Sequence, residues 1–131
     1  MTETYMTIRE MCDAYDVTPR TLRFYESKEL LFPHRQGKRR LFTKSDRARL
    51  KLIMRGKRFG FSLEDIRQLL DLYDPNQGNL PQMQRTYELA KERLADLEDR
   101  QKELAKVIDD LKAQLKWGNE MISSVQKTAA E

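Results

Sequence analysis

The chain contains few of the residues from which disulfides, metal sites and catalytic centres are built. Its 131 residues include one cysteine and one histidine, Cys12 and His34. A lone thiol forms no internal disulfide and cannot supply the two or three soft ligands of a thiolate metal site. No catalytic triad, paired carboxylates or glycine-rich phosphate loop can be recognised. The sequence therefore predicts a protein that is not an enzyme and holds no metal and no cofactor.

Long apolar runs are also missing. No stretch of about 18 apolar residues occurs, which excludes a transmembrane helix. The first five residues lack the basic and apolar regions of a secretory signal. We therefore expect a cytoplasmic protein that does not bind membranes.

Charge is divided unevenly along the chain. Residues 1–61 hold 15 Lys and Arg against 7 Asp and Glu, a net charge of +8, whereas residues 62–131 hold 10 against 14, a net charge of −4. A basic segment next to an acidic one indicates a nucleic-acid surface at one end and a partner-binding element at the other.

Residues 17–26 have the pattern of a DNA recognition helix. Thr18 is a good N-cap, and Pro19 stands at the first helical position, where a missing N–H costs nothing. Leu22 would face the core, while Arg20, Thr21 and Arg23 would point outward. The first turns of such a helix enter the major groove, where arginine can bind guanine or phosphate. Arg20 is the candidate base reader and Tyr25 the candidate phosphate-binding hydroxyl.

Residues 34–42 predict a short basic hairpin. Its turn lies around Gly37, and Leu41 and Phe42 could anchor it to a core. A small basic hairpin beside a recognition helix is a wing that can grip phosphates or the minor groove. The residues that make it basic are Arg35, Lys38, Arg39 and Arg40.

These segments closely resemble the N-terminal signature of the MerR family of bacterial transcription regulators. The matching motifs are residues 17–31, 35–42, 42–46 and 60–66, in the family's order, and the resemblance covers roughly residues 5–73. It implies that the turn between the third and fourth helices is a second wing, with Lys57 and Arg58 at phosphate. The chain departs from the family at Asp16 and Glu29, where glycine is usual, and at Arg39, where tyrosine is usual. The full set of candidate DNA contacts is Thr18, Arg20, Thr21, Arg23, Tyr25, Arg35, Lys38, Arg39, Arg40, Lys57 and Arg58.

Some members of the family are thiolate metal sensors, with cysteines at the start of the dimer helix and in the loop beyond its end. Residues 78–84 and 116–128 contain none here. The resemblance is therefore to the short, cysteine-poor branch that does not sense metals.

Capping boxes mark three helix starts: Thr7 with Glu10, Thr43 with Asp46, and Ser62 with Asp65. The fourth helix would bury a stripe that includes Tyr73, and residues 74–79 have the composition of a loop. We predict a DNA-binding domain over residues 5–74, a linker over 75–80, a coiled-coil helix over 81–117 that ends at Trp117-Gly118, and a short tail over 118–131.

From residue 81 the apolar positions repeat every seven residues. One series is Tyr87, Leu94, Gln101, Ile108, Leu115 and Ile122, and the other is Met83, Ala90, Leu97, Leu104, Leu111 and Gly118. Such a narrow seam needs a partner helix. The alternative is a long helix packed back on its own domain. The predicted dimer interface consists of Tyr87, Leu94, Leu97, Gln101, Leu104, Ile108, Leu111 and Leu115, and family precedent implies antiparallel helices.

The sequence thus predicts a mainly α fold: a winged helix-turn-helix DNA-binding domain followed by a long coiled-coil dimerisation helix. Its function would be to regulate transcription as a homodimer on an inverted repeat in double-stranded DNA. RNA polymerase and a small-molecule effector are further candidate partners, and nucleoid association would follow from DNA binding. Promoter distortion is expected from the family, and residues 35–41 resemble a subgroup that controls catabolic operons. The alternatives are an excisionase-like architectural protein that bends DNA and a scaffold whose coiled coil binds another protein.

Overall fold

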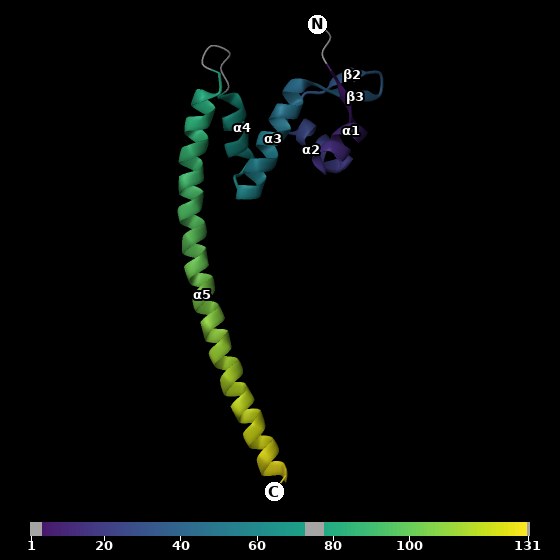
Figure 1. Cartoon of the computed structure of the whole chain (residues 1–131). Helices are drawn as coiled ribbons and strands as arrows, with labels where there is room; N and C mark the ends of the chain where they lie inside the picture. Colours follow the sequence, from purple (N-terminus) through teal and green to yellow (C-terminus); the bar gives the residue numbers. More distant parts are fainter. Residues whose placement is uncertain (1–3, 73–77, 131) are drawn as a thin grey trace. The chain divides into compact units, whose positions relative to one another are not determined.

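The computed structural model describes residues 4–72 and 78–130. It is mainly helical, as predicted, and its elements are labelled in Figure 1. In chain order they are β1 (Met6–Thr7), α1 (Ile8–Tyr15), α2 (Pro19–Ser27), β2 (His34–Gln36), β3 (Arg39–Phe42), α3 (Lys44–Phe59), α4 (Leu63–Asp71) and α5 (Leu80–Ala130). The chain forms two compact units, Met1–Ala90 and Lys91–Glu131. Tyr73 and residues 74–77, which we assigned to a helix stripe and a loop, lie outside the described residues.

Side chains cap the helices of the first unit largely as the sequence predicts. Thr7 and Thr43 each form a complete capping box. The Thr18 hydroxyl accepts a hydrogen bond from the backbone N–H of Thr21. The predicted third box is only half correct: Ser62 Oγ accepts from the Asp65 N–H, but no reciprocal bond is recorded among the described residues. These local bonds satisfy donors that the first helical turn leaves unpaired.

Two acidic residues adopt the left-handed backbone conformation at positions where the resemblance implies glycine. Asp16 has φ 53° and Glu29 has φ 59°. Glycine enters this region freely, whereas other residues enter it at some cost in free energy. Asp16 caps α1, and Glu29 follows directly after the C-cap of α2. The bends before and after α2 therefore keep their geometry despite the unusual residues.

The wing is part of a three-stranded antiparallel sheet with the order β1-β3-β2. The hairpin β2–β3 was predicted, but β1 was missed because two residues carry no strand periodicity. In β1, Met6 pairs with Phe42 and Thr7 pairs with Leu41. The Phe42 side chain is fully buried. The base of the wing is thus joined both to the strand before α1 and to the core.

One hydrophobic cluster holds the first unit together. It includes Leu22 and Tyr25 of α2, Leu50 of α3 and Leu89 of α5. Asp46 is also buried, and its two carboxylate oxygens accept from the Phe32 N–H at 2.8 Å and the Thr43 N–H at 3.0 Å. A buried carboxylate is tolerated when such bonds satisfy it. The single capping residue therefore also fixes the segment that joins α2 to the wing.

Gly56 of α3 offers a stability test with a built-in control. A Cβ at this position would stand 2.8 Å from Cγ1 of the buried Ile66. We expect Gly56→Ala to lower the free energy of unfolding by about 1–2 kcal/mol, because overpacking outweighs the gain in helix propensity. Gly118→Ala, with nothing within 4 Å of the new Cβ, should raise it by about 0.5–1 kcal/mol. Thermal and urea unfolding would check both, and a Gly56→Ala variant at least as stable as the wild type would contradict the crowding at Gly56.

Helix α5 is longer than the sequence indicated. It continues through Trp117 and Gly118 to Ala130. The predicted end at Trp117-Gly118 and the separate tail are therefore wrong. A glycine inside a helix costs only about 1 kcal/mol relative to alanine, which neighbouring helical residues offset. The apolar spacing also continues beyond Gly118, at Ile122 and Val125.

Candidate nucleic-acid interface

The outward face of α2 presents two arginines to solvent. Arg20 and Arg23 are exposed, and no ion pair or hydrogen bond joins either of them to another described residue. Thr18 and Thr21 are less available, because their hydroxyl oxygens lie 2.8 Å apart and Thr18 also caps the helix. The structure therefore leaves the two arginines more available to a partner than the two threonines.

Two aromatic residues of α2 differ from expectation. Tyr25 is only 6% exposed, and burial raises the pKa of its hydroxyl. The ring of Tyr25 lies in the core, so only its hydroxyl could make the predicted phosphate contact. Phe24, which we did not single out, is 43% exposed, with Lys28 Nζ 5.7 Å from the ring centroid. An exposed apolar ring on this helix is the signal that could have identified it as a candidate contact to a thymine methyl group.

Arginines from neighbouring helices hold the end of α2. Arg67 of α4 donates a hydrogen bond to the carbonyl of Lys28, the C-cap of α2. Arg49 of α3 donates from Nε to the carbonyl of Leu30 at 2.7 Å, and burial is the largest cause that lowers its pKa. Carbonyls at a helix end have no partner within the helix. These contacts fix α2 against the rest of the unit, and neither was predicted from the sequence.

Glu26 of α2 joins the recognition helix to the wing. Its Oε2 lies 3.1 Å from Arg35 Nη2, and its Oε1 lies 2.7 Å from Arg40 Nε. Arg35 and Arg40 are directly opposite each other on β2 and β3. Like charges in such a pair repel, and a carboxylate between them removes the repulsion. The two arginines that were predicted as DNA contacts therefore hold the wing against α2.

Lys38 and Arg39 are the exposed basic residues of the wing that the described ion pairs do not use. Lys38 follows Gly37, whose φ of 62° makes the tight turn. His34 stacks on Tyr5, with ring centroids 5.7 Å apart. Lys57 and Arg58 are exposed in the last turn of α3, just before Gly60 ends the helix with φ 83°. Basic side chains thus lie on α2, on the wing and at the end of α3.

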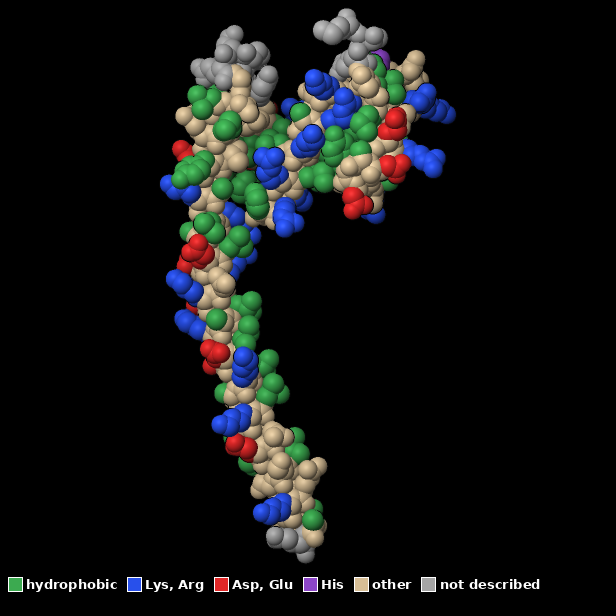
Figure 2. Space-filling model, in the orientation of Figure 1, with side chains coloured by type: hydrophobic (Ala, Val, Ile, Leu, Met, Phe, Trp, Pro, Cys, Tyr) green, Lys and Arg blue, Asp and Glu red, His purple; other side chains and the backbone are tan. Residues whose placement is uncertain are grey.

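The predicted dimer interface is solvent-exposed in the single subunit. All of its members are exposed. They are Tyr87, Leu94, Leu97, Gln101, Leu104, Ile108, Leu111 and Leu115. Hydrophobic side chains recur along α5 in Figure 2. Before residue 91 the helix does contact its own unit, through Leu89, Ala90 and a bond from Gln82 Nε2 to the Leu69 carbonyl. The alternative of a helix packed back on its own domain therefore holds for the first turns of α5, up to residue 90.

Within the described residues, no group of three or more His, Cys, Asp and Glu side chains could hold a metal ion. Cys12 is a half-buried free thiol in α1. No helix of the described chain combines the length and the apolar character needed to cross a bilayer.

Two family models match the chain. The model described as MerR HTH family regulatory protein matches residues 6–73, and the model described as MerR, DNA binding matches residues 47–114. The first match alone spans more than half of the chain. The chain belongs to the MerR family. It is accordingly a DNA-binding transcriptional regulator, with the helix-turn-helix that the sequence predicted.

Individual members of the MerR family agree with this assignment. The chain is 34% identical over 110 residues to the HTH-type transcriptional regulator ZntR of Escherichia coli (strain K12), covering 78% of this chain and 77% of ZntR. It is 31% identical over 104 residues to the mercuric resistance operon regulatory protein of Pseudomonas fluorescens, covering 78% and 69%. Both relatives are named as regulators.

Solved MerR structures share the fold. A MerR family regulator from Bacillus cereus superposes with a TM-score of 0.66 at 29% identity, covering 81% of this chain and 76% of that one. MtaN, the N-terminal part of the Bacillus subtilis multidrug transporter activator, gives a TM-score of 0.61 at 29% identity, covering 79% and 94%. HiNmlR, solved bound to promoter DNA, has 24% identity and a TM-score of 0.58, covering 89% and 92%, which shows the fold alone.

Proposed function

We propose that two copies of the chain bind an inverted-repeat operator, each placing α2 in a major groove. The observation that carries this proposal is the exposed pair Arg20 and Arg23 on a helix whose position the surrounding contacts fix. A groove contact needs donors that are held in place yet not used inside the protein. Lys38, Arg39, Lys57 and Arg58 would bind phosphates on either side. Each such contact should steepen the salt dependence of binding by about one unit.

The reason for a second copy lies in the exposed apolar side chains of α5 and not in the DNA-binding unit. Beyond residue 90 the helix has the exposed seam of Leu94, Leu97, Leu104, Ile108 and Leu111. An amphipathic row of this length is stable in water when a second helix covers it. We infer a homodimer with antiparallel α5 helices, as the family resemblance implies. Its two-fold axis would match that of the inverted repeat.

Promoter distortion follows if the dimer is stiff. Two recognition helices held by rigid helices have a set separation, and a promoter that does not match it must bend or twist to meet both. RNA polymerase would then use the distorted promoter, and a small-molecule effector could shift the balance between the two DNA shapes. We include RNA polymerase and the effector in the proposal because both would act through the separation of the two recognition helices.

Footprinting tests the proposal directly. Purified protein would be incubated, at physiological salt and with excess competitor DNA, with the DNA upstream of its own and neighbouring genes. We expect one protected inverted repeat that overlaps a promoter. Weak, uniform protection would instead support an architectural DNA-bending protein, and no protection at moderate salt would support a protein-binding scaffold.

Glu26→Gln is expected to separate specific from non-specific binding. Removing the carboxylate adds positive charge to the surface, which favours any DNA. It also leaves Arg35 and Arg40 repelling each other on neighbouring strands, which loosens the wing. Operator affinity should therefore fall by about fivefold while affinity for random duplex rises. Fluorescence anisotropy on both duplexes would measure this.

The control for this variant is Glu103→Gln on α5, which makes the same charge change at an exposed site. It should leave operator affinity unchanged or slightly raised. If Glu26→Gln raises the affinity for both duplexes equally, the ion pairs do not position the wing for specific binding.

A further inference from the structure

The apolar seam of α5 contains both small and large side chains. Ala90 and Gly118 are its small members. Leu94 and Ile122 are large, and both are exposed in the single subunit. A helix that covers the seam must place large side chains opposite small ones, because well-packed apolar contacts leave no voids. The sizes along the seam therefore restrict how a second copy of α5 can lie on it.

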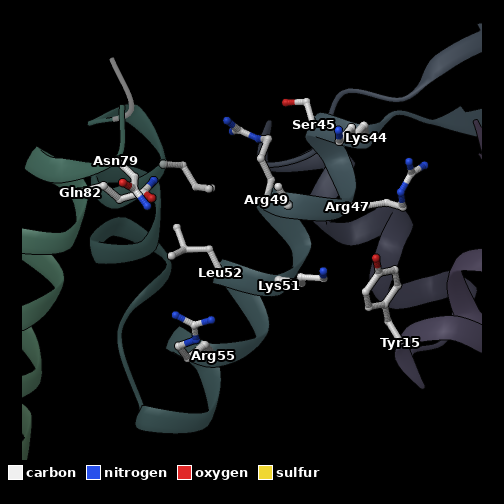
Figure 3. Close-up of a pocket in the computed structure, with 12 residues that line it drawn as sticks. Tyr15, Lys44, Ser45, Arg47, Arg49, Lys51, Leu52, Arg55, Asn79 and Gln82 are labelled. Carbon is white, nitrogen blue, oxygen red and sulfur yellow. The ribbon is translucent and has the colours of Figure 1, made fainter. Parts of the chain in front are cut away.

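The first turn of α5 is used by the chain's own unit. Gln82 donates from Nε2 to the Leu69 carbonyl at 2.8 Å, and Asn79 and Gln82 line a pocket along α3 that Figure 3 shows. Tyr87 is the first exposed seam residue after these contacts. Val125 is the last apolar member, and α5 is helical over the whole distance between the two. The seam that a second copy can cover thus runs from residue 87 to residue 125.

Antiparallel helices match these sizes when the two-fold axis crosses α5 at Lys106. Every seam position from 87 to 125 then faces another seam position of the partner, and both small residues face large ones. The facing pairs are Tyr87 with Val125, Ala90 with Ile122, Leu94 with Gly118, Leu97 with Leu115, Gln101 with Leu111, and Leu104 with Ile108. In a parallel pair each residue would face its own copy, so Gly118 would face Gly118 and leave a void.

Charges beside the seam distinguish this antiparallel alignment from its neighbours. With the axis at Lys106, Glu98 lies next to the partner's Lys112, and the two-fold symmetry forms this pair twice. Both side chains are exposed in the single subunit. A shift by one heptad in one direction would bring Lys91 next to the partner's Lys112, and like charges repel. A shift in the other direction would carry Tyr87 past the end of the partner's seam.

The same alignment accounts for an exposed apolar residue outside the seam. Val107 is 59% exposed and belongs to neither of the two apolar series. It is adjacent to Lys106, so Val107 and its copy would lie side by side at the axis. Ala105 would face its own copy on the other side of the axis, where its small side chain permits close approach. Neither position then carries a charge into the centre of the dimer.

We propose that two copies of α5 pair in this alignment, with the axis at Lys106 and an ion pair between Glu98 and the partner's Lys112. The proposal rests on the antiparallel homodimer inferred above and adds the residues that align it. It also extends the interface beyond the predicted Leu115, to Val125. A shift by one heptad slides one helix about 10 Å along the other, the length of about three base pairs. These residues would therefore help to set the half-site spacing that the dimer can bind.

Spin labels on the outer side of α5 would measure the alignment. Lys102→Cys and Ser123→Cys, each in a full chain that also carries Cys12→Ser, give one label per subunit at an exposed position away from the seam. In antiparallel helices the two labels move apart by about 3 Å for each residue between the label and the axis. By double electron–electron resonance we expect separations of about 50–55 Å at residue 123 and about 20–30 Å at residue 102.

The distances separate failure of the alignment from failure of the homodimer. A separation at residue 123 that differs by about 10 Å or more would mean a shifted alignment. Similar short separations at both positions would mean parallel helices. Either result would overturn the proposal while leaving a dimer. The mass of a monomer in light scattering, with no measurable separation, would refute the homodimer as well.

Reversal of the two charges is an independent test. Glu98→Lys alone or Lys112→Glu alone should raise the dissociation constant of the dimer about tenfold, because each creates two pairs of like charges. Glu98→Lys/Lys112→Glu restores opposite charges, so its dissociation constant in sedimentation experiments should return to within about twofold of the wild type. Glu120→Lys, a reversal at an exposed position away from the seam, is the control and should dimerise normally. A double variant that dimerises no better than the single ones would overturn the pairing of Glu98 with Lys112.

Discussion

Leu104→Glu is expected to convert the protein into a monomer. Leu104 is 60% exposed in the single subunit, so the carboxylate is solvated there and the subunit should remain helical and folded. In a dimer the same position lies in the seam, and each subunit contributes one charge to an apolar contact. The dissociation constant should therefore rise by roughly a hundredfold or more, because a buried charge without a partner costs several kcal/mol.

Light scattering coupled to gel filtration would give the mass of the variant. Lys102→Glu is the control, since it adds a glutamate two residues away on a position outside both apolar series. It should stay dimeric. An unchanged mass for Leu104→Glu would refute the coiled-coil assignment, whereas aggregation of both variants would point to a general charge effect.

Monomerisation should also weaken operator binding. A two-fold dimer binds both halves of an inverted repeat, and the second half-site is contacted at a high effective concentration. The monomer loses that advantage although its α2 is intact. A Leu104→Glu variant that footprints like the wild type would show that the DNA-binding unit acts alone.

Arg23→Ala is expected to abolish specific DNA binding while leaving the dimer intact. Arg23 is exposed on α2 and contributes nothing to the described packing, so its loss should not alter unfolding. An arginine at a base edge or phosphate contributes about 1–3 kcal/mol, and a dimer loses it twice. Operator affinity should therefore fall by about thirtyfold or more.

Anisotropy with the footprinted operator would measure this loss, and gel filtration would confirm the mass. Arg85→Ala removes an arginine from an exposed ion pair with Glu88 on α5 and serves as the control. Its effect should be small, because exposed pairs contribute little. Retained operator affinity in Arg23→Ala would move the recognition surface away from α2.

Features that depend on neighbours in sequence were predicted well. Thr18, Thr43 and Gly60 mark helix ends in the sequence and do so in the structure. The reason is physical: a cap satisfies backbone groups within three or four residues, so its sequence pattern is local. The repeat of apolar residues in α5 is equally local. The error at Trp117-Gly118 arose because one weak helix former was given more weight than the continuing repeat.

Contacts between residues that are distant in sequence could not be predicted from local sequence patterns. The pairing of β1 with β3 joins residues far apart in sequence, and no pattern in two residues announces it. Burial of the Tyr25 ring depends on the packing of several helices. The bonds from Glu26 to Arg35 and Arg40 are another example, since composition showed only a basic hairpin and an acidic side chain elsewhere.

The sequence by itself determined the helix starts, the wing hairpin, the uneven charge and the seam of α5, because each is written in residue spacing or in counts. Only the tertiary structure decided which cations are left for a partner. Arg35, Arg40, Arg47 and Arg49 bond within the protein, whereas Arg20, Arg23, Lys51 and Arg55 point to solvent without a described partner. Charge is a property of the residue, but its availability depends on what the fold places beside it.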